Sequence, residues 1–148
     1  MLRQGPIPLT VHAALEPVVA ALFIGAPFLF GFSDLGAPTA VSIVVGVAVL
    51  VVALSTCWRL SLIKAIPVPA HLMLDLGLSA LLIASPFLFG FSDQGAPTAF
   101  FIIMGVLDLV AALATRWQSS PSETYSRDDV LAERMGGRRR RFGRAPQH

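Results

Sequence analysis

The chain has 148 residues, of which 55% are hydrophobic and only 14% are charged, with a formal net charge of +2. Soluble domains carry about 25% charged residues, so this composition and a mean hydropathy of +0.72 exclude an ordinary soluble domain. The single cysteine, Cys57, excludes an intrachain disulfide, a CxxC redox pair and a zinc site made of several cysteines.

Charged residues are scarce through most of the chain. Seven acidic or basic residues occur between Val11 and Thr115: Glu16, Asp34, Arg59, Lys64, Asp75, Asp93 and Asp108. The apolar runs between them are long enough to cross a bilayer, which takes about 20 helical residues. In chain order we predict membrane-spanning helices at about residues 11–32, 37–56, 70–91 and 96–115.

The segment before the first helix is not a typical secretory signal. Arg3 is its only basic residue, and Pro6 and Pro8 interrupt the approach to the apolar run. The same run has an intact copy later in the chain, so we expect it to be retained as a membrane span. Because Pro17 disfavours helical geometry at Glu16, an alternative prediction is that the first span starts at Pro17.

The chain contains an internal repeat with an offset of 59 positions. Residues 27–34 recur as residues 86–93, and about 27 of the 47 positions from His12 to Trp58 are identical in the second copy. Each copy holds two of the predicted helices. The predicted organisation is an N-terminal arm (1–10), a first repeat (11–58), a linker (59–69), a second repeat (70–117) and a basic, largely disordered tail (118–148).

The distribution of lysine and arginine predicts the orientation in the membrane. All eleven basic residues lie in the arm, in the linker or beyond the fourth helix, and the two tight turns contain none. Those turns hold Asp34 and Asp93, which we expect to act as turn formers. By the positive-inside rule both termini and the linker are cytoplasmic, and Trp58 and Trp117 are expected at the inner membrane interface.

Two spans per repeat mean that both repeats enter the membrane from the same side. The repeats are therefore parallel, related by a pseudo-twofold axis along the membrane normal. Small residues spaced by four let helices approach closely in lipid. This spacing predicts helix contacts at Ala21 and Gly25, at Ala80 and Ala84, and at Ser42 and Gly46.

The centre of each repeat has a short motif, Ala26-Pro27-Phe28 or Ser85-Pro86-Phe87, followed by Gly-Phe-Ser and a second apolar helix. Over residues 12–117 this arrangement resembles the SPW repeat family of small bacterial membrane proteins, named for a Ser-Pro-Trp motif in the first of two transmembrane helices. Alanine replaces serine in the first copy, and phenylalanine replaces tryptophan in both. The resemblance implies an all-α membrane protein of two tandem helical hairpins, and it implies no catalytic residue.

Proline occurs inside two of the predicted spans. Pro27 and Pro86 each remove a backbone hydrogen bond to the carbonyl four residues earlier, at Phe23 and Leu82. We therefore expect a kink in the outer half of the first and third helices. It is either a hinge or a static bend, and we favour the static bend.

Histidine and carboxylate residues form a predicted polar cluster near the cytoplasmic end of the spans. His12 and Glu16, like His71 and Asp75, are four positions apart and so share a helix face. Asp108 on the fourth helix is expected at a similar depth, where its counterpart in the first repeat is Val49.

Three interpretations of this cluster remain open. The sequence favours interfacial polar residues that pair locally; a protonatable cluster that couples protons or cations ranks second. A metal site ranks third, because both histidines are expected at the wet interface. A charge at the bilayer centre costs about 2.5 to 3.5 kcal/mol on insertion scales, so every interpretation needs these side chains to face the bundle or water.

The tail carries a basic cluster of Arg138, Arg139, Arg140, Arg141 and Arg144. Its position just beyond a span, with Phe142 within it, favours binding to anionic lipid of the inner leaflet. Nucleic acid or an acidic protein partner is the less favoured alternative.

The sequence contains no Gly-rich phosphate loop, nucleophile elbow or HExxH motif, so we expect no enzyme activity and no cofactor. The favoured function is a structural, accessory or regulatory role in the bacterial plasma membrane, as a homo-oligomer or beside another membrane protein. The alternative is a small proton- or cation-coupled transporter that uses the predicted polar cluster.

The orientation is testable by cysteine labelling in a Cys57→Ser background. Single cysteines at Asp34 and Asp93 should react with a membrane-impermeant thiol reagent added outside intact cells, since both turns are predicted to face outward. A cysteine at Lys64 should react only after the membrane is opened. External labelling at Lys64 would reverse the orientation.

Overall fold

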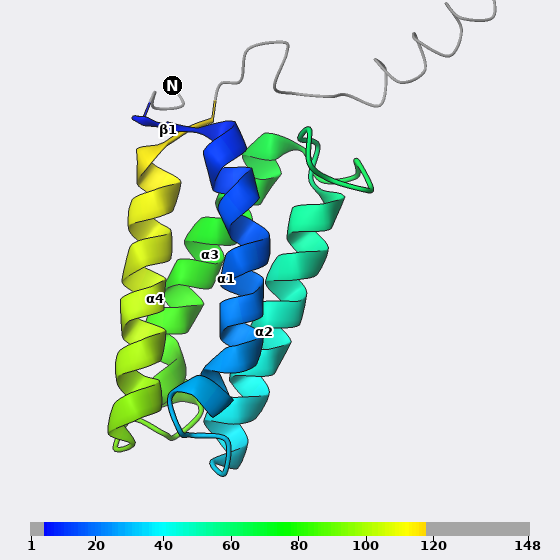
Figure 1. Ribbon diagram of the computed structural model, residues 1–148. Coiled ribbons are helices and arrows are strands. Elements are labelled where there is room, and N and C mark those ends of the chain that lie inside the picture. The colour runs from blue at the N-terminus through cyan, green and yellow to red at the C-terminus, as the bar shows by residue number, and fades with distance from the viewer. Residues whose placement is uncertain (1–4, 118–148) are drawn as a thin grey trace, which may run out of the picture.

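The computed structural model describes residues 5–117, which form a bundle of four helices, each antiparallel to the next along the chain (Figure 1). The elements are β1 (Ile7–Pro8), α1 (Leu9–Leu29), α2 (Gly36–Ser55), α3 (Val68–Leu88), α4 (Gly95–Ala114) and β2 (Thr115–Arg116). All four helices are long and apolar enough to cross a membrane. The prediction of an all-α, four-span protein is confirmed, with helix boundaries one to three residues earlier than expected.

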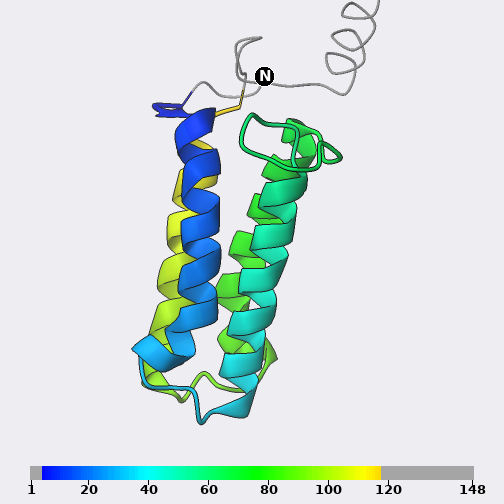
Figure 2. The ribbon, with the colours of Figure 1, turned by 45° about the vertical axis from the view of Figure 1, so that its right-hand side comes forward.

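Each repeat folds as a hairpin whose two helices pack extensively against each other, α1 on α2 and α3 on α4. The two tight turns lie at one end of the bundle, and β1, the linker and the end of α4 lie at the other (Figures 1 and 2). The basic tail, including Arg138 to Arg144, lies outside the described residues.

Short backbone pairings close the bundle at the end that holds the termini. Ile7 of β1 pairs with Thr115 of β2, and Thr56 pairs with Ile66 in the linker. These two pairings are equivalent under the 59-residue offset, because Ile7 corresponds to Ile66 and Thr56 to Thr115. The end of each repeat is thus joined to the start of the other, as a pseudo-twofold axis requires.

Glycine allows the two helices of each hairpin to approach closely. A Cβ atom on Gly46 would lie 2.7 Å from the Ala20 carbonyl oxygen, and one on Gly105 would lie 3.0 Å from the Ser79 carbonyl oxygen. The predicted contact at Gly46 is therefore correct. The predicted contact at Ala21 is wrong, because Ala21 is exposed and its neighbour Ala20 lies at the contact instead.

The helix ends at the tight turns are fixed by a left-handed glycine. Gly31 and Gly90 have φ angles of 67° and 68°, and the N–H of the following Phe32 or Phe91 donates to the carbonyl of the motif proline. This pattern is a Schellman motif, which glycine favours because it has no Cβ. It ends both helices three residues before the predicted boundary.

Proline is tolerated inside α1 and α3. Helix α1 begins at Leu9 and continues through Pro17. The alternative start at Pro17 is therefore wrong, and Glu16 is helical. Pro27 and Pro86 lie in the last turn of α1 and α3. Each proline still leaves the carbonyl four residues earlier, at Phe23 or Leu82, without its helical hydrogen bond.

The carbonyls freed by the motif prolines receive serine hydroxyls. In the second repeat, Ser85 of the motif donates to the Leu82 carbonyl oxygen at 2.8 Å. The first repeat has Ala26 at the equivalent position, and there Ser42 of α2 donates to the Phe23 carbonyl oxygen at 2.6 Å. The lost motif serine is thus replaced by a serine from the neighbouring helix.

Apolar side chains fill the bundle near its two ends. One core lies toward the tight turns and contains the buried rings of Phe23, Phe32, Phe91, Phe100 and Phe101. The other lies toward the termini and is built around Leu9, Val68, Leu72 and the two tryptophans, Trp58 and Trp117. The section between them contains the candidate site.

The role of Ser42 is testable by a pair of substitutions. Ser42→Ala should lower the free energy of unfolding by about 0.6 kcal/mol, the average measured for side-chain hydrogen bonds in a membrane protein, and by no more than the measured maximum of about 1.7 kcal/mol. Adding Ala26→Ser should restore much of the loss, because it recreates the arrangement of Ser85. Unfolding in mixed micelles would measure both, and a Ser42→Ala protein as stable as wild type would contradict this role.

Candidate functional site

Four ionisable side chains meet between the two repeats and are called here the His–carboxylate cluster: His12 and Glu16 of α1, and His71 and Asp75 of α3. Nε2 of His12 lies 3.3 Å from a Glu16 oxygen and 3.4 Å from an Asp75 oxygen. Nε2 of His71 lies 3.6 Å from Glu16 and 3.2 Å from Asp75. Each histidine therefore contacts the carboxylate of its own helix and that of the other repeat.

Threonine from the opposite repeat holds each imidazole. The hydroxyl of Thr56 donates to the carbonyl oxygen four residues earlier and lies 2.9 Å from Nδ1 of His71. The hydroxyl of Thr115 does the same and lies 3.1 Å from Nδ1 of His12. Since a hydroxyl has one proton and gives it to the carbonyl, it accepts the proton of Nδ1–H.

Tryptophan covers the cluster from the end that holds the termini. The ring centroid of Trp58 lies 4.4 Å from that of His71, and the centroid of Trp117 lies 5.1 Å from that of His12. Each indole N–H donates to the carbonyl five residues earlier, at the end of α2 or α4. The rings are only 2% and 5% exposed, so both indoles are buried within the bundle.

These tryptophans and threonines change the environment expected for the histidines. His12 is 5% exposed and His71 is 0% exposed, although both were expected at a wet interface. The reason is that the chain after each second helix turns inward over the neighbouring repeat, as the pairings of Thr56 and Thr115 show.

A cavity of about 370 Å³ lies beside the cluster, on the approximate symmetry axis of the repeats. Its polar lining comes from His12, Glu16, Asp75 and Asp108, and the remaining lining is apolar. Most lining positions occur as pairs related by the 59-residue offset: Leu15 and Leu74, Glu16 and Asp75, Val19 and Leu78, Phe23 and Leu82, Ala48 and Leu107, Val49 and Asp108, Val52 and Ala111.

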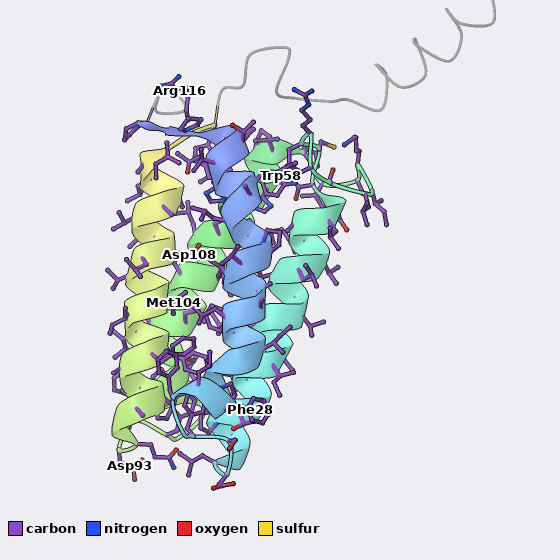
Figure 3. The ribbon with its side chains drawn as sticks, viewed as in Figure 1. Phe28, Trp58, Asp93, Met104, Asp108 and Arg116 are labelled. Carbon is purple, nitrogen blue, oxygen red and sulfur yellow. The ribbon has the colours of Figure 1, made fainter. Side chains whose placement is uncertain are left out.

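Asp108 is separate from the four clustered groups. Its Oδ2 accepts a hydrogen bond from the Ser79 hydroxyl at 2.9 Å, and the same hydroxyl lies 2.7 Å from the Asp75 carbonyl oxygen. Figure 3 shows Asp108 on α4, about halfway along the bundle and one turn from Met104. The structure therefore brings four of the five residues of the predicted polar cluster together and places the fifth in the adjacent cavity wall.

The other predicted residues lie away from this site. Asp34 and Asp93 are exposed in the tight turns, at the opposite end of the bundle from Trp58 (Figure 3). Pro27 and Pro86 lie near those turns.

Sequence reasoning missed the threonines and did not predict that the tryptophans pack against the histidines. The available signal was the repeat itself, because Thr56 and Thr115, like Trp58 and Trp117, are identical in both copies.

The family model for the SPW repeat domain matches residues 10–115, which is more than half of the chain. The chain belongs to the SPW repeat family. Comparison with curated proteins and with solved structures finds no match. In these SPW repeats the third motif position faces outward, since Phe28 and Phe87 are 69% and 67% exposed. The motif thus shapes the turn end of each hairpin, far from the His–carboxylate cluster.

The burial of the tryptophans is testable by fluorescence quenching. Trp58 and Trp117 are the only tryptophans in the sequence, so they give all of the indole emission. In detergent or liposomes their emission should be blue-shifted and weakly quenched by acrylamide, and unfolding should raise the quenching constant severalfold. Strong quenching in the folded protein, comparable to an interfacial indole, would contradict the covering role described above.

Proposed function

We propose that the chain has a structural, accessory or regulatory role in the bacterial plasma membrane, with both termini cytoplasmic, and that it is not an enzyme. The observation that carries this proposal is the mutual enclosure of the His–carboxylate cluster. Its groups contact one another across the two repeats, and side chains of the opposite repeat cover each histidine. Such an arrangement is suited to holding two hairpins in one fixed relation.

Energetic reasoning supports this structural use of the cluster. The hydrophobic effect does not drive helices together in lipid, because lipid tails are themselves apolar. Close packing and polar contacts between the helices stabilise their association instead. An isolated charge inside the bundle would be costly, whereas each charged group here meets partners from the other repeat. Separating the repeats would leave all four groups without those partners.

The outer surface supports an accessory role in the membrane. Large apolar side chains are exposed on all four helices, including Val18, Val44, Met73 and Val110. Lipid or the apolar helices of a partner would cover these faces, so the proposal includes a homo-oligomer or an accessory membrane partner. The basic tail would add contacts to anionic lipid of the cytoplasmic leaflet.

A second candidate function is proton- or cation-coupled transport. The observation that favours it is the cavity of about 370 Å³, which joins the cluster to the carboxylate of Asp108. A carboxylate outside the cluster, on the wall of a cavity within the membrane-spanning region, is the kind of group that proton relays use. Nucleic acid is not a proposed partner.

Neutral isosteres separate these two functions. Asp75→Asn and Asp108→Asn keep the side-chain shape and remove only the charge. In liposomes, we expect wild type and both variants to show proton and cation flux near that of empty vesicles. Native-membrane purification should recover the chain as a defined oligomer or with a stoichiometric partner. A pH-dependent flux that either variant abolishes would reject the structural role and establish transport.

A further inference from the structure

We propose that the His–carboxylate cluster binds one divalent transition-metal ion of the zinc class, through Nε2 of His12, Nε2 of His71, Glu16 and Asp75. This inference goes beyond the accessory role and does not depend on it. The four ligand atoms, one from each residue, all lie within 4.8 Å of one another. Two imidazole nitrogens and two carboxylate oxygens are donors that zinc accepts.

The distances between histidine nitrogens and carboxylate oxygens are longer than direct charge-assisted hydrogen bonds. Each Nε2 lies 3.2 to 3.6 Å from Oε1 of Glu16 and from one oxygen of Asp75, with Oδ2 facing His12 and Oδ1 facing His71, and the four donor atoms of one ligand set lie within 4.8 Å of one another. With zinc–ligand bonds of about 2.0 to 2.1 Å, the edges of a tetrahedron of ligands are about 3.3 to 3.4 Å. A charge-assisted hydrogen bond between a protonated histidine and a carboxylate is shorter, about 2.7 to 2.9 Å.

The hydrogen bonds of the imidazoles leave the right atom free for a metal. With Thr56 and Thr115 accepting the Nδ1 protons, an imidazole in its neutral form has its lone pair on Nε2. Within residues 5–117, both Nε2 atoms and Oδ2 of Asp75 are buried without a hydrogen-bond partner. In this neutral form the Nε2 lone pairs face carboxylate oxygens, and a bound cation would take the place that a proton on Nε2 holds in the metal-free protein.

The surrounding residues supply the outer shell that metal-bound histidines usually have. The other nitrogen of such a histidine commonly donates to an oxygen, which fixes the tautomer and the direction of the ring. Each threonine does this here from the opposite repeat. Trp58 and Trp117 exclude water on the side of the site that faces the end with the termini, which strengthens electrostatic interactions within the site.

Charge balance also supports a divalent ion. Two neutral imidazoles and two carboxylates carry a total charge of −2, which is costly inside an apolar bundle. A divalent cation neutralises the site in one step. The argument that ranked a metal site last was the expected exposure of the histidines, and at 5% and 0% exposure that argument no longer applies.

Metal binding to the full chain, purified in detergent and stripped with a chelator, tests the proposal. Titration with Co²⁺ should give the visible absorption of tetrahedral cobalt and saturate at one ion per chain. Zn²⁺ should displace the cobalt, and Mg²⁺ should not, because Mg²⁺ prefers six oxygen ligands. A folded, monodisperse wild type that takes up neither Co²⁺ nor Zn²⁺ at micromolar concentrations would overturn the proposal.

Variants locate the ion. Glu16→Gln and His71→Gln should abolish the cobalt absorption, and the outer-shell change Thr56→Val should weaken affinity about 10- to 100-fold. Asp108→Asn is the matched control, since it removes a carboxylate of the same cavity outside the ligand set, and it should bind as wild type does. Cobalt uptake unchanged in Glu16→Gln and His71→Gln would place the ion elsewhere, such as at His148, and reject the site.

X-ray absorption of the zinc-loaded wild type keeps the test decisive if the ligand variants fail to fold. The spectrum should show four nitrogen and oxygen neighbours at about 2.0 to 2.1 Å, with the multiple scattering of two imidazoles. A spectrum without imidazole scattering, or with six oxygen neighbours, would contradict the assignment.

Discussion

The arrangement of the two repeats depends on the burial of two imidazoles and two carboxylates in an apolar bundle. None of these groups is stable there without a partner, and each repeat supplies one imidazole and one carboxylate. The contacts between His12 and Asp75 and between His71 and Glu16 join the repeats and fix their relative rotation. The Thr56–His71 and Thr115–His12 contacts also join the two repeats, on the side of the histidines that faces the end with the termini.

A pseudo-twofold axis explains how a short duplicated sequence produces a four-group site. One hairpin alone offers a single histidine and carboxylate on one face of a helix. Two parallel copies bring those faces together across the axis. The same axis requires the end of each repeat to meet the start of the other, which the Thr56–Ile66 and Ile7–Thr115 pairings achieve. The tryptophans that follow the threonines are then carried over the histidines.

The fold was largely predictable from the sequence, because apolar run length and the repeat depend only on local information. The i, i+4 spacing of His12 and Glu16 also placed both side chains on one face. Contacts between repeats were not predictable in this way. Trp58 and Trp117 follow a general preference for the membrane interface, yet the inward turn of the chain buries them. Pro17 was expected to disturb the helix, and α1 continues through it.

The two repeats differ in sequence at some positions, and there the pseudo-twofold symmetry of the bundle is broken. Ser42 in the first repeat corresponds to Phe101 in the second, and Ala26 corresponds to Ser85. The two differences compensate each other, because each repeat has one serine that donates to the carbonyl freed by proline.

Asp108 is a different kind of departure. Its partner Ser79 corresponds to Ala20, and Asp108 itself corresponds to Val49, so the second repeat alone has this hydrogen-bonded pair. The first repeat shows that the packing does not need this pair. A carboxylate at a membrane-buried position is costly, and the hydrogen bond from Ser79 offsets part of that cost. Asp108 is thus the residue to which the transport alternative would assign a role, separate from the four groups proposed to bind a metal ion.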